Sequence, residues 1–139
     1  MYVDLDNFKA VNDMHGHQAG DNLLIKIRDI LVQQTRPTDA ISRLGGDEFA
    51  VWLNGADLTI AKTRAGQFLE RIGALAHLSG SPDRPIGMSI GIAAWEPHAE
   101  EDLDSLLARA DAAMYQAKRG GKGSFTIADP PPAPAQAPA

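Results

Sequence analysis

The chain has 139 residues, 44% of them hydrophobic and 22% charged, which describes one globular domain large enough to bury its own core. The formal net charge of −5 argues against a nucleic-acid partner, and the absence of cysteine excludes disulfides, thiolate metal sites and thiol catalysis. No apolar run approaches the roughly 20 residues of a membrane span, so we predict a cytoplasmic domain that makes no membrane contact through this chain.

The first part of the chain predicts a strand and two helices. A short strand is expected over 2–6, directly followed by a short helix over 7–14. Asp6 or Asn7 is suited to be the N-cap of that helix, because a side-chain oxygen there accepts from a free backbone N–H. Apolar residues at helical spacing predict an amphipathic helix over 18–35.

The centre of the chain predicts a hairpin. Apolar strands over 40–44 and 48–53 flank the stretch Arg-Leu-Gly-Gly-Asp-Glu-Phe at 43–49. Two adjacent glycines suit a tight turn, because they adopt positive φ without steric cost. Asp47 and Glu48 follow at once. Such a turn allows a phosphorylated ligand to approach the backbone through a cation, although an ordinary acidic hairpin explains the same residues.

The second half predicts a helix over 57–77, a strand over 86–95, a helix that begins after the N-cap Asp102, and a last strand over 124–127. The resulting order, βααββαβαβ, predicts an α/β (α+β) sandwich with a central, mostly antiparallel sheet and surrounding helices. Residues 1–128 would form this domain. The remaining residues, 129–139, are rich in Pro and Ala and are expected to form a disordered tail.

Acidic side chains gather at one predicted edge of the sheet. If the hairpin pairs beside the first strand, Asp4 comes close to Asp47 and Glu48. Three carboxylates repel one another unless a cation neutralises them, and Mg²⁺ prefers such hard oxygen ligands. The helix start at Asn7 and Phe8 adds free N–H groups that suit phosphates. The simpler alternative for Asp4 is an exposed acid at a strand end.

Several separated motifs carry a family resemblance. They are Asp4-Leu5-Asp6-Asn7-Phe8-Lys9, Asn12-Asp13, Gly16-His17, Gly20-Asp21, Arg43-Leu44-Gly45-Gly46-Asp47-Glu48-Phe49, Ser89-Ile90-Gly91, Ala110-Asp111, Ala113-Met114-Tyr115 and Ala117-Lys118. In this order, from residue 3 to about 127, they resemble the GGDEF family of diguanylate cyclases. The resemblance implies a fold similar to nucleotide cyclases and polymerase palm domains.

The resemblance also implies an activity. The family joins two GTP molecules into cyclic di-GMP and releases pyrophosphate, across a homodimer with one GTP on each subunit. It uses Mg²⁺ (or Mn²⁺), two ions in each active site. The implied metal ligands are Asp4, the Leu5 carbonyl, Asp47 and Glu48. The implied catalytic residues are Gly45, Gly46, Asp47 and Glu48, and Glu48 also helps to deprotonate the attacking 3′-hydroxyl.

Further residues match substrate-binding positions of the family. Asn12 and Asp21 would recognise guanine, because an amide and a carboxylate satisfy its polar edge. Their structural alternative is helix-end capping. The phosphates would be bound by Asn7, Phe8, Lys118 and Lys122. Lys122 stands where the family usually has Arg, so the bidentate contact is lost there. Lys118 is alternatively a solvated charge at a helix C-terminus.

A second site is implied by Arg36 and Asp39. Their R-x-x-D spacing before the two glycines resembles the family's allosteric inhibitory site for cyclic di-GMP, the product. Arg offers a planar fork to phosphate or guanine, and Asp accepts from the guanine edge. The alternative is a Pro-Thr-Asp turn after a helix.

The chain also departs from the family pattern. A helix and an Asp-x-Leu-Thr-x-Leu-x-Asn-Arg stretch usually precede the first strand, so we expect an N-terminally truncated domain whose own activity is open. A catalytically impaired regulatory module that binds cyclic di-GMP is therefore the alternative function, and an inactive fragment is a third. GTP would be a substrate only if the chain is an active diguanylate cyclase.

Overall fold

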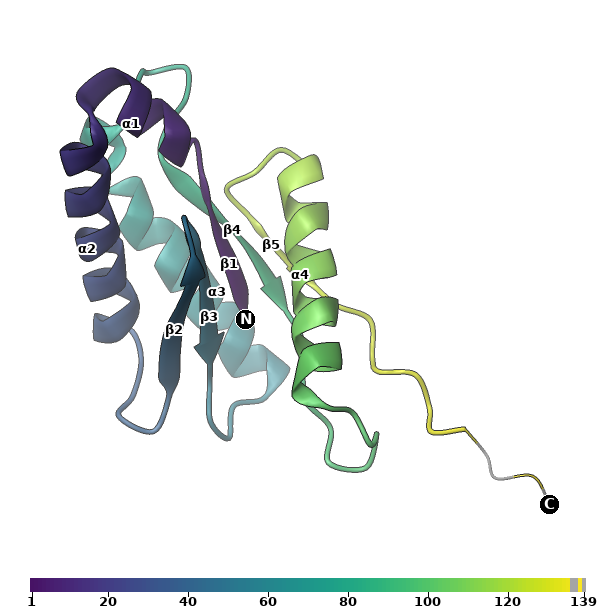
Figure 1. The fold of residues 1–139 in the computed structure, drawn as a ribbon. Coiled ribbons are helices and arrows are strands. Elements are labelled where there is room, and N and C mark those ends of the chain that lie inside the picture. The colour runs from purple at the N-terminus through teal and green to yellow at the C-terminus, as the bar shows by residue number, and fades with distance from the viewer. Residues whose placement is uncertain (136–137, 139) are drawn as a thin grey trace.

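One mixed sheet forms the centre of the computed structural model, which describes residues 1–135 and 138 (Figure 1). Its strands are β1 (Tyr2–Asp6), β2 (Ala40–Gly45), β3 (Glu48–Trp52), β4 (Gly87–Ile92) and β5 (Phe125–Ile127). Within the described residues they lie in the order β2-β3-β1-β4-β5. All neighbouring pairs are antiparallel except β4 and β5, which are parallel. The predicted mostly antiparallel sheet is confirmed.

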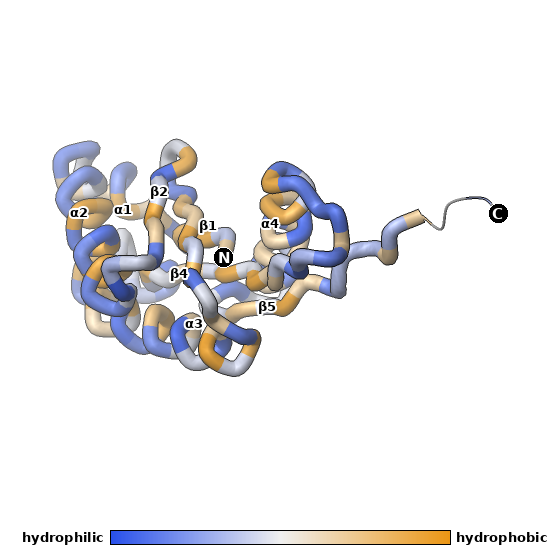
Figure 2. Tube along the Cα trace, turned by 90° about the horizontal axis from the view of Figure 1, so that it is seen from below, coloured by the Kyte–Doolittle hydropathy of each residue, from blue (hydrophilic) through white to orange (hydrophobic). Residues whose placement is uncertain are grey.

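Four α-helices of the described chain cover this sheet, and a short 3-10 helix follows the third. They are α1 (Phe8–His15), α2 (His17–Gln33), α3 (Leu58–Gly73), the 3-10 segment Ala76–Leu78, and α4 (Leu103–Arg119). Helices α2 and α3 pack on one face of the sheet and α4 on the other (Figure 2). Gly91 permits the close approach of α4, because a Cβ there would lie 1.8 Å from the Ala110 carbonyl oxygen.

Strand β1 directs its side chains alternately to the two faces, as the period of two requires. Val3 and Leu5 are buried in the main core, together with side chains of α2 and α3. Asp4 and Asp6 therefore point the other way, where both contact Lys118 of α4. The central strand thus carries apolar packing on one face and two carboxylates on the other.

The predicted order βααββαβαβ is confirmed, with small shifts in the bounds. The strand expected over 86–95 already ends at Ile92, and Trp95 lies beyond it with 48% of its surface exposed. Asp102 caps α4 as expected, and its Oδ1 accepts from the Ser105 N–H at 2.8 Å. Of the predicted tail at 129–139, the described residues 129–135 and 138 form no helix or strand, and 136, 137 and 139 lie outside the described residues.

No helix among the described residues has the length and apolarity that crossing a bilayer requires.

Candidate active site

The turn between β2 and β3 is built on two glycines at positive φ, 146° for Gly45 and 48° for Gly46. The predicted hairpin turn is therefore confirmed, and the glycines are required by the backbone conformation. The Arg43 guanidinium fixes the turn by donating to the Gly46 carbonyl at 3.0 and 2.7 Å. The next residue, Asp47, accepts from the Leu5 N–H at 3.1 Å through its carbonyl, which joins the turn to β1.

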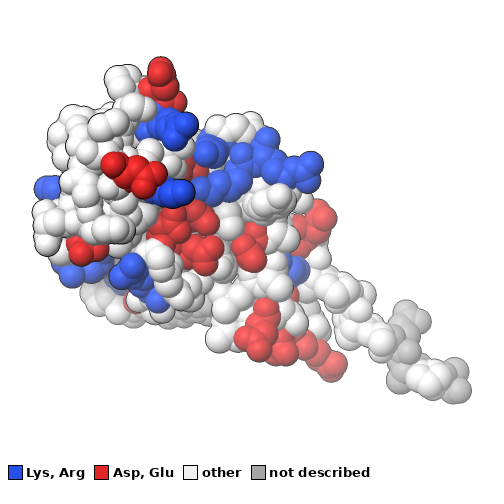
Figure 3. All heavy atoms as spheres, turned by 45° about the horizontal axis from the view of Figure 1, so that its top comes forward, with Lys and Arg blue, Asp and Glu red and all other residues white. Residues whose placement is uncertain are grey.

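A cavity of about 590 Å³ lies between the end of β1, the start of α1 and the C-terminal part of α4. It is lined by Asp4, Leu5, Asn7, Phe8, Lys9, Ala10, Asp47, Arg84, Met114, Tyr115, Lys118 and Lys122. The view onto the top of the molecule shows basic side chains directly beside acidic ones (Figure 3). Four basic and two acidic side chains thus share one opening, an arrangement that suits a polyanionic ligand accompanied by cations.

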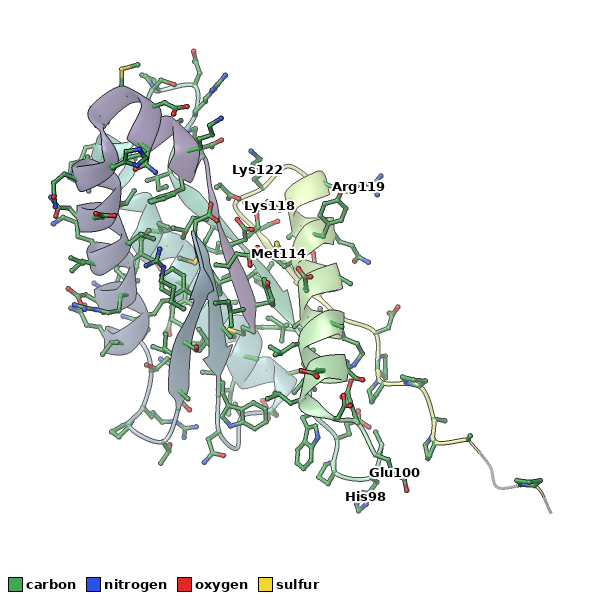
Figure 4. All side chains as sticks on the ribbon, in the orientation of Figure 1. His98, Glu100, Met114, Lys118, Arg119 and Lys122 are labelled. Atoms are coloured by element: carbon green, nitrogen blue, oxygen red, sulfur yellow. The ribbon has the colours of Figure 1, made fainter. Side chains whose placement is uncertain are left out.

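Lys118 is the central cation of this cavity. Its Nζ donates to the Leu5 carbonyl at 2.8 Å, to Asp6 Oδ1 at 2.8 Å and to Asp4 Oδ1 at 2.9 Å. Burial lowers the pKa of the ammonium, but the hydrogen bonds to Asp6 and Asp4 outweigh it and raise the pKa above its ordinary value. Figure 4 shows Lys118 and Lys122 between α4 and the start of α1, whereas Arg119 points outward.

The prediction that Asp6 could cap the N-terminus of α1 is wrong. The Asp6 side chain is only 3% exposed and turns away from α1 into the sheet. Oδ1 accepts from the Ser89 hydroxyl at 2.8 Å, and Oδ2 accepts from the Gly123 N–H at 2.8 Å. Asn7 stands at the N-cap position with φ 60° but makes no side-chain capping bond. Its amide nitrogen donates to the Pro85 carbonyl, and its Oδ1 accepts from Lys122 Nζ at 3.3 Å. The Asp6 side chain thus binds partners more than 80 residues away along the chain instead of capping α1.

Glu48 lies opposite Asp4 in the pairing of β1 with β3, as the sequence suggested. The Tyr2 hydroxyl donates to Glu48 Oε2 at 2.8 Å. Glu48 is absent from the lining of the cavity, and so are Gly45 and Gly46. Within residues 1–135 and 138, no group of three or more His, Asp or Glu side chains converges in a geometry that would hold a metal ion. A metal ion here would need further oxygen ligands beside the carboxylates, from the backbone, water or substrate phosphate.

The two carboxylates of the cavity carry unfavourable charge. Burial raises the pKa of Asp4 above its ordinary value; Lys118 opposes this shift and Glu48 adds to it. Burial also raises the pKa of Asp47, and the neighbouring Asp4 adds to the effect. Raised values mean that the folded protein does not fully compensate these negative charges, which is the electrostatic condition for attracting a cation.

Asn12 and Gly20 form a close contact between α1 and α2. A Cβ at Gly20 would lie 1.8 Å from Asn12 Oδ1, so the glycine makes room for the amide. Asn12 Oδ1 is buried and has no hydrogen-bond partner among the described residues. Such an acceptor is costly unless a donor reaches it. Asp21 follows Gly20 directly and is exposed. Neither Asn12 nor Asp21 has a side-chain capping role in the described helices.

Arg36 and Asp39 lie in the turn before β2, outside the cavity. Asp39 is 1% exposed, and its two oxygens accept from the N–H groups of Arg36 at 2.8 Å and Asn54 at 2.9 Å. Burial raises the pKa of Asp39, but these backbone hydrogen bonds outweigh it and lower the pKa overall. The Arg36 guanidinium donates to the Asn54 carbonyl at 2.7 Å and remains 54% exposed. The carboxylate thus organises a turn, and the guanidinium faces solvent.

Sequence reasoning missed several residues that line the cavity, including Lys9, Arg84 and Tyr115. Lys9 belongs to the first motif of the family resemblance, but its local sequence indicates no role for it. Arg84 belongs to a loop between α3 and β4, and nothing in its local sequence indicates that the loop reaches the start of α1. A surplus of basic residues near a predicted phosphate site is the signal that would have drawn attention to both.

The comparisons with known proteins decide the family. A family model described as "Diguanylate cyclase, GGDEF domain" matches residues 1–124. The chain belongs to the GGDEF domain family. MucR of Pseudomonas aeruginosa, a bifunctional diguanylate cyclase/cyclic di-GMP phosphodiesterase, is 40% identical to this GGDEF domain over 125 residues, which is 90% of this chain and 18% of MucR. The diguanylate cyclase TpbB of Pseudomonas aeruginosa is 40% identical over 133 residues, 93% of this chain and 30% of TpbB.

Solved structures support the same assignment. The GGDEF domain of DgcB from Caulobacter crescentus, in complex with cyclic di-GMP, superposes with a TM-score of 0.80 at 28% identity, over 91% of this chain and 74% of that one. This GGDEF domain therefore has the α+β fold of its family. It spans less than a third of the length of the two curated relatives named above.

Proposed function

We propose that this chain is a diguanylate cyclase that condenses two GTP molecules into cyclic di-GMP. The observation that carries the proposal is the cavity at the end of β1, where Asp4 and Asp47 lie beside four basic side chains. A nucleoside triphosphate has the charge that such a lining complements. The similarity to MucR and TpbB, which are named diguanylate cyclases, favours the same chemistry.

The residues present fit a divalent metal ion, Mg²⁺ or Mn²⁺. Asp4 Oδ1 and the Leu5 carbonyl oxygen are hard ligands of the kind that Mg²⁺ prefers. Both already contact one cation, the Lys118 ammonium. Asp47 and Glu48 would complete the protein ligands after their side chains turn toward the ion, because three carboxylates do not converge on one point among the described residues. When bound, such ions neutralise phosphate charge and lower the pKa of the attacking hydroxyl. We take two ions in each active site as the working number.

The nucleotide would be held by residues that line the cavity and by Asn12 and Asp21, which lie outside its lining. The backbone N–H groups of Asn7 and Phe8 at the start of α1 would bind the phosphates, with Lys118 and Lys122 as cations. Guanine would reach Asn12, whose buried Oδ1 has no partner among the described residues and accepts from the exocyclic amine. Asp21, next to Gly20, would accept from the guanine N1–H.

The proposed reaction is a nucleotidyl transfer carried out twice. The 3′-oxygen of each GTP bonds to the α-phosphorus of the other, and the bond from that phosphorus to the pyrophosphate oxygen breaks. Two GTP thus give one cyclic di-GMP and two pyrophosphates, while the 3′-hydroxyl protons leave. Glu48, oriented by the Tyr2 hydroxyl, would accept such a proton. If the cavity at the end of β1 holds one GTP in each chain, the symmetrical product calls for a homodimer.

Product inhibition would use Arg36 and Asp39. The exposed guanidinium of Arg36 is available to a guanine or phosphate, and Asp39 holds the turn that presents it. Calorimetry with cyclic di-GMP tests this site: the wild type should bind and Arg36→Ala should bind at least tenfold more weakly. Equal binding by both proteins would refute the assignment. Binding without any turnover of GTP would favour the alternative, a regulatory module that binds cyclic di-GMP.

The cyclase activity is tested by incubating the purified chain with GTP and Mg²⁺ and quantifying cyclic di-GMP by chromatography. We expect product from the wild type at high protein concentration, with a rate per chain that rises with concentration as dimers form. Asp4→Asn should abolish it. Asp29→Asn is the matched control, because Asp29 pairs with Arg28 on the exposed surface of α2. Absence of cyclic di-GMP at every protein concentration would refute the proposal.

A further inference from the structure

Two neighbouring carboxylates of β1 hold the Lys118 ammonium in different ways. Asp4 is 19% exposed and lines the cavity. Asp6 is buried, and its oxygens also accept from the Ser89 hydroxyl and the Gly123 N–H. Ser89 itself is fully buried. Asp6 is thus fixed by β4 and by the turn after α4, whereas Asp4 contacts Lys118 from the cavity.

All three protons of the Lys118 ammonium are engaged, by the Leu5 carbonyl, Asp4 and Asp6. The first two acceptors are also the proposed metal ligands. Two cations that share the same two oxygens repel each other, and the repulsion is strong in a half-buried site. A divalent ion can therefore bind Asp4 and Leu5 fully only when the ammonium leaves them.

We propose that Asp6 is a positioning residue that keeps Lys118 in the site, and that Lys118 and the metal ion compete for Asp4 Oδ1 and the Leu5 carbonyl. Once displaced, the ammonium retains its bond to Asp6 and turns into the cavity, where a nucleotide phosphate is its natural partner. Metal and nucleotide then assist each other's binding through one lysine. This inference rests on the proposed function, because it takes Asp4 and Leu5 as metal ligands.

The first test measures binding of Mn²⁺ alone, without nucleotide, by electron paramagnetic resonance. Lys118→Met should bind Mn²⁺ about tenfold more tightly than the wild type, because two charge-assisted hydrogen bonds no longer have to be broken. Lys122→Met is the matched control. It removes the same charge from the same cavity, but Lys122 contacts Asn7 Oδ1 at 3.3 Å and neither proposed ligand, so its Mn²⁺ affinity should change much less.

The second test needs no change at Lys118. In protein labelled with ¹⁵N-lysine, the ammonium resonance of Lys118 should shift on titration with Mg²⁺ and should stay distinct from exposed lysines, because Asp6 still holds it. In Asp6→Asn the same resonance should move to the position of exposed lysines at saturating Mg²⁺. Ser89→Ala, which leaves the carboxylate in place, should preserve the wild-type behaviour.

The outcomes separate this inference from the proposed function. If Asp4→Asn weakens Mn²⁺ binding but Lys118→Met does not tighten it, the metal site stands and the competition is refuted. A Lys118 resonance that is unmoved by saturating Mg²⁺ would refute it as well. If the wild type binds no Mn²⁺, both the metal assignment and the competition fail.

Discussion

Two regions of the molecule pair an aspartate with a basic side chain, and they differ in whether the protein satisfies the charge. In the turn before β2, two backbone N–H groups bind Asp39 and lower its pKa. In the cavity, burial raises the pKa of Asp4 and of Asp47, and Lys118 compensates only in part. A satisfied carboxylate stabilises the fold, whereas an unsatisfied one is available to a ligand. On these physical grounds we propose the cavity as the functional region.

The largest expected effect concerns Asp47. Asp47→Asn should lower the rate of cyclic di-GMP formation about 100-fold or more, because a ligand of the proposed metal is lost. The free energy of unfolding should rise, since a raised carboxylate pKa means that the charge is unfavourable in the folded state. Steady-state kinetics and urea denaturation measure the two quantities. If Asp47→Asn lowers both the activity and the free energy of unfolding, the Asp47 charge stabilises the fold as that of Asp39 does, and the proposed difference between the two regions is wrong.

Asp39→Asn should act in the opposite direction on stability. At pH 7 we expect a loss of about 1–2 kcal/mol, because one of two backbone donors loses its acceptor. The folded-state pKa of Asp39 lies below its ordinary value of 3.8, so the carboxylate stabilises the fold above that pH. Its contribution disappears as the pH falls through the folded-state value. The difference between wild type and variant, followed by urea denaturation, should shrink below pH 4; a constant difference would contradict the account.

Gly20→Ala tests a buried neutral group without a hydrogen-bond partner in the described part of the chain, the side-chain oxygen of Asn12. The added Cβ would collide with Asn12 Oδ1, so the amide must turn away from the proposed guanine pocket. We expect the KM for GTP to rise about fivefold, the cost of one hydrogen bond. Gly66→Ala is the control, because a Cβ at that position of α3 meets no atom within 4 Å. Equal KM values for both variants would refute the proposed role of Asn12 in binding guanine.

The smallest expected effect belongs to Arg84, which lines the cavity from the loop before β4. Arg84→Met should raise the KM for GTP about threefold, the usual size of a contribution from an exposed charge, and added salt should reduce the difference. Arg71→Met, on the exposed surface of α3, should leave KM unchanged. Kinetics at two ionic strengths measure this. A threefold change in both variants would indicate a non-specific effect of net charge.

Much of the fold could be predicted from local patterns. The two glycines predicted the turn at Gly45 and Gly46, and both adopt positive φ. Apolar patterns and capping residues predicted the α-helices and strands of the described chain in the confirmed order, but not the 3-10 segment Ala76–Leu78. The proximity of Asp4 to the hairpin also followed, because Asp4 pairs with Glu48.

Asp6 could not be predicted in the same way. Its position before a helix favoured a cap, and capping needs only local information. Its actual partners are Ser89, Lys118 and Gly123, between 83 and 117 residues away. Those contacts depend on how β4 and α4 pack on β1, which no local pattern encodes. The alternation of β1 does place Asp4 and Asp6 on one face, and that was the signal available.

The most direct test of the central claim is a crystal structure of the chain with Mn²⁺ and a GTP analogue that cannot be cleaved. We predict an anomalous peak bound to Asp4 and the Leu5 carbonyl, with Lys118 moved from those two oxygens to a phosphate while it keeps its bond to Asp6. A peak that avoids Asp4 and Leu5, or a nucleotide bound outside the cavity at the end of β1, would contradict the account.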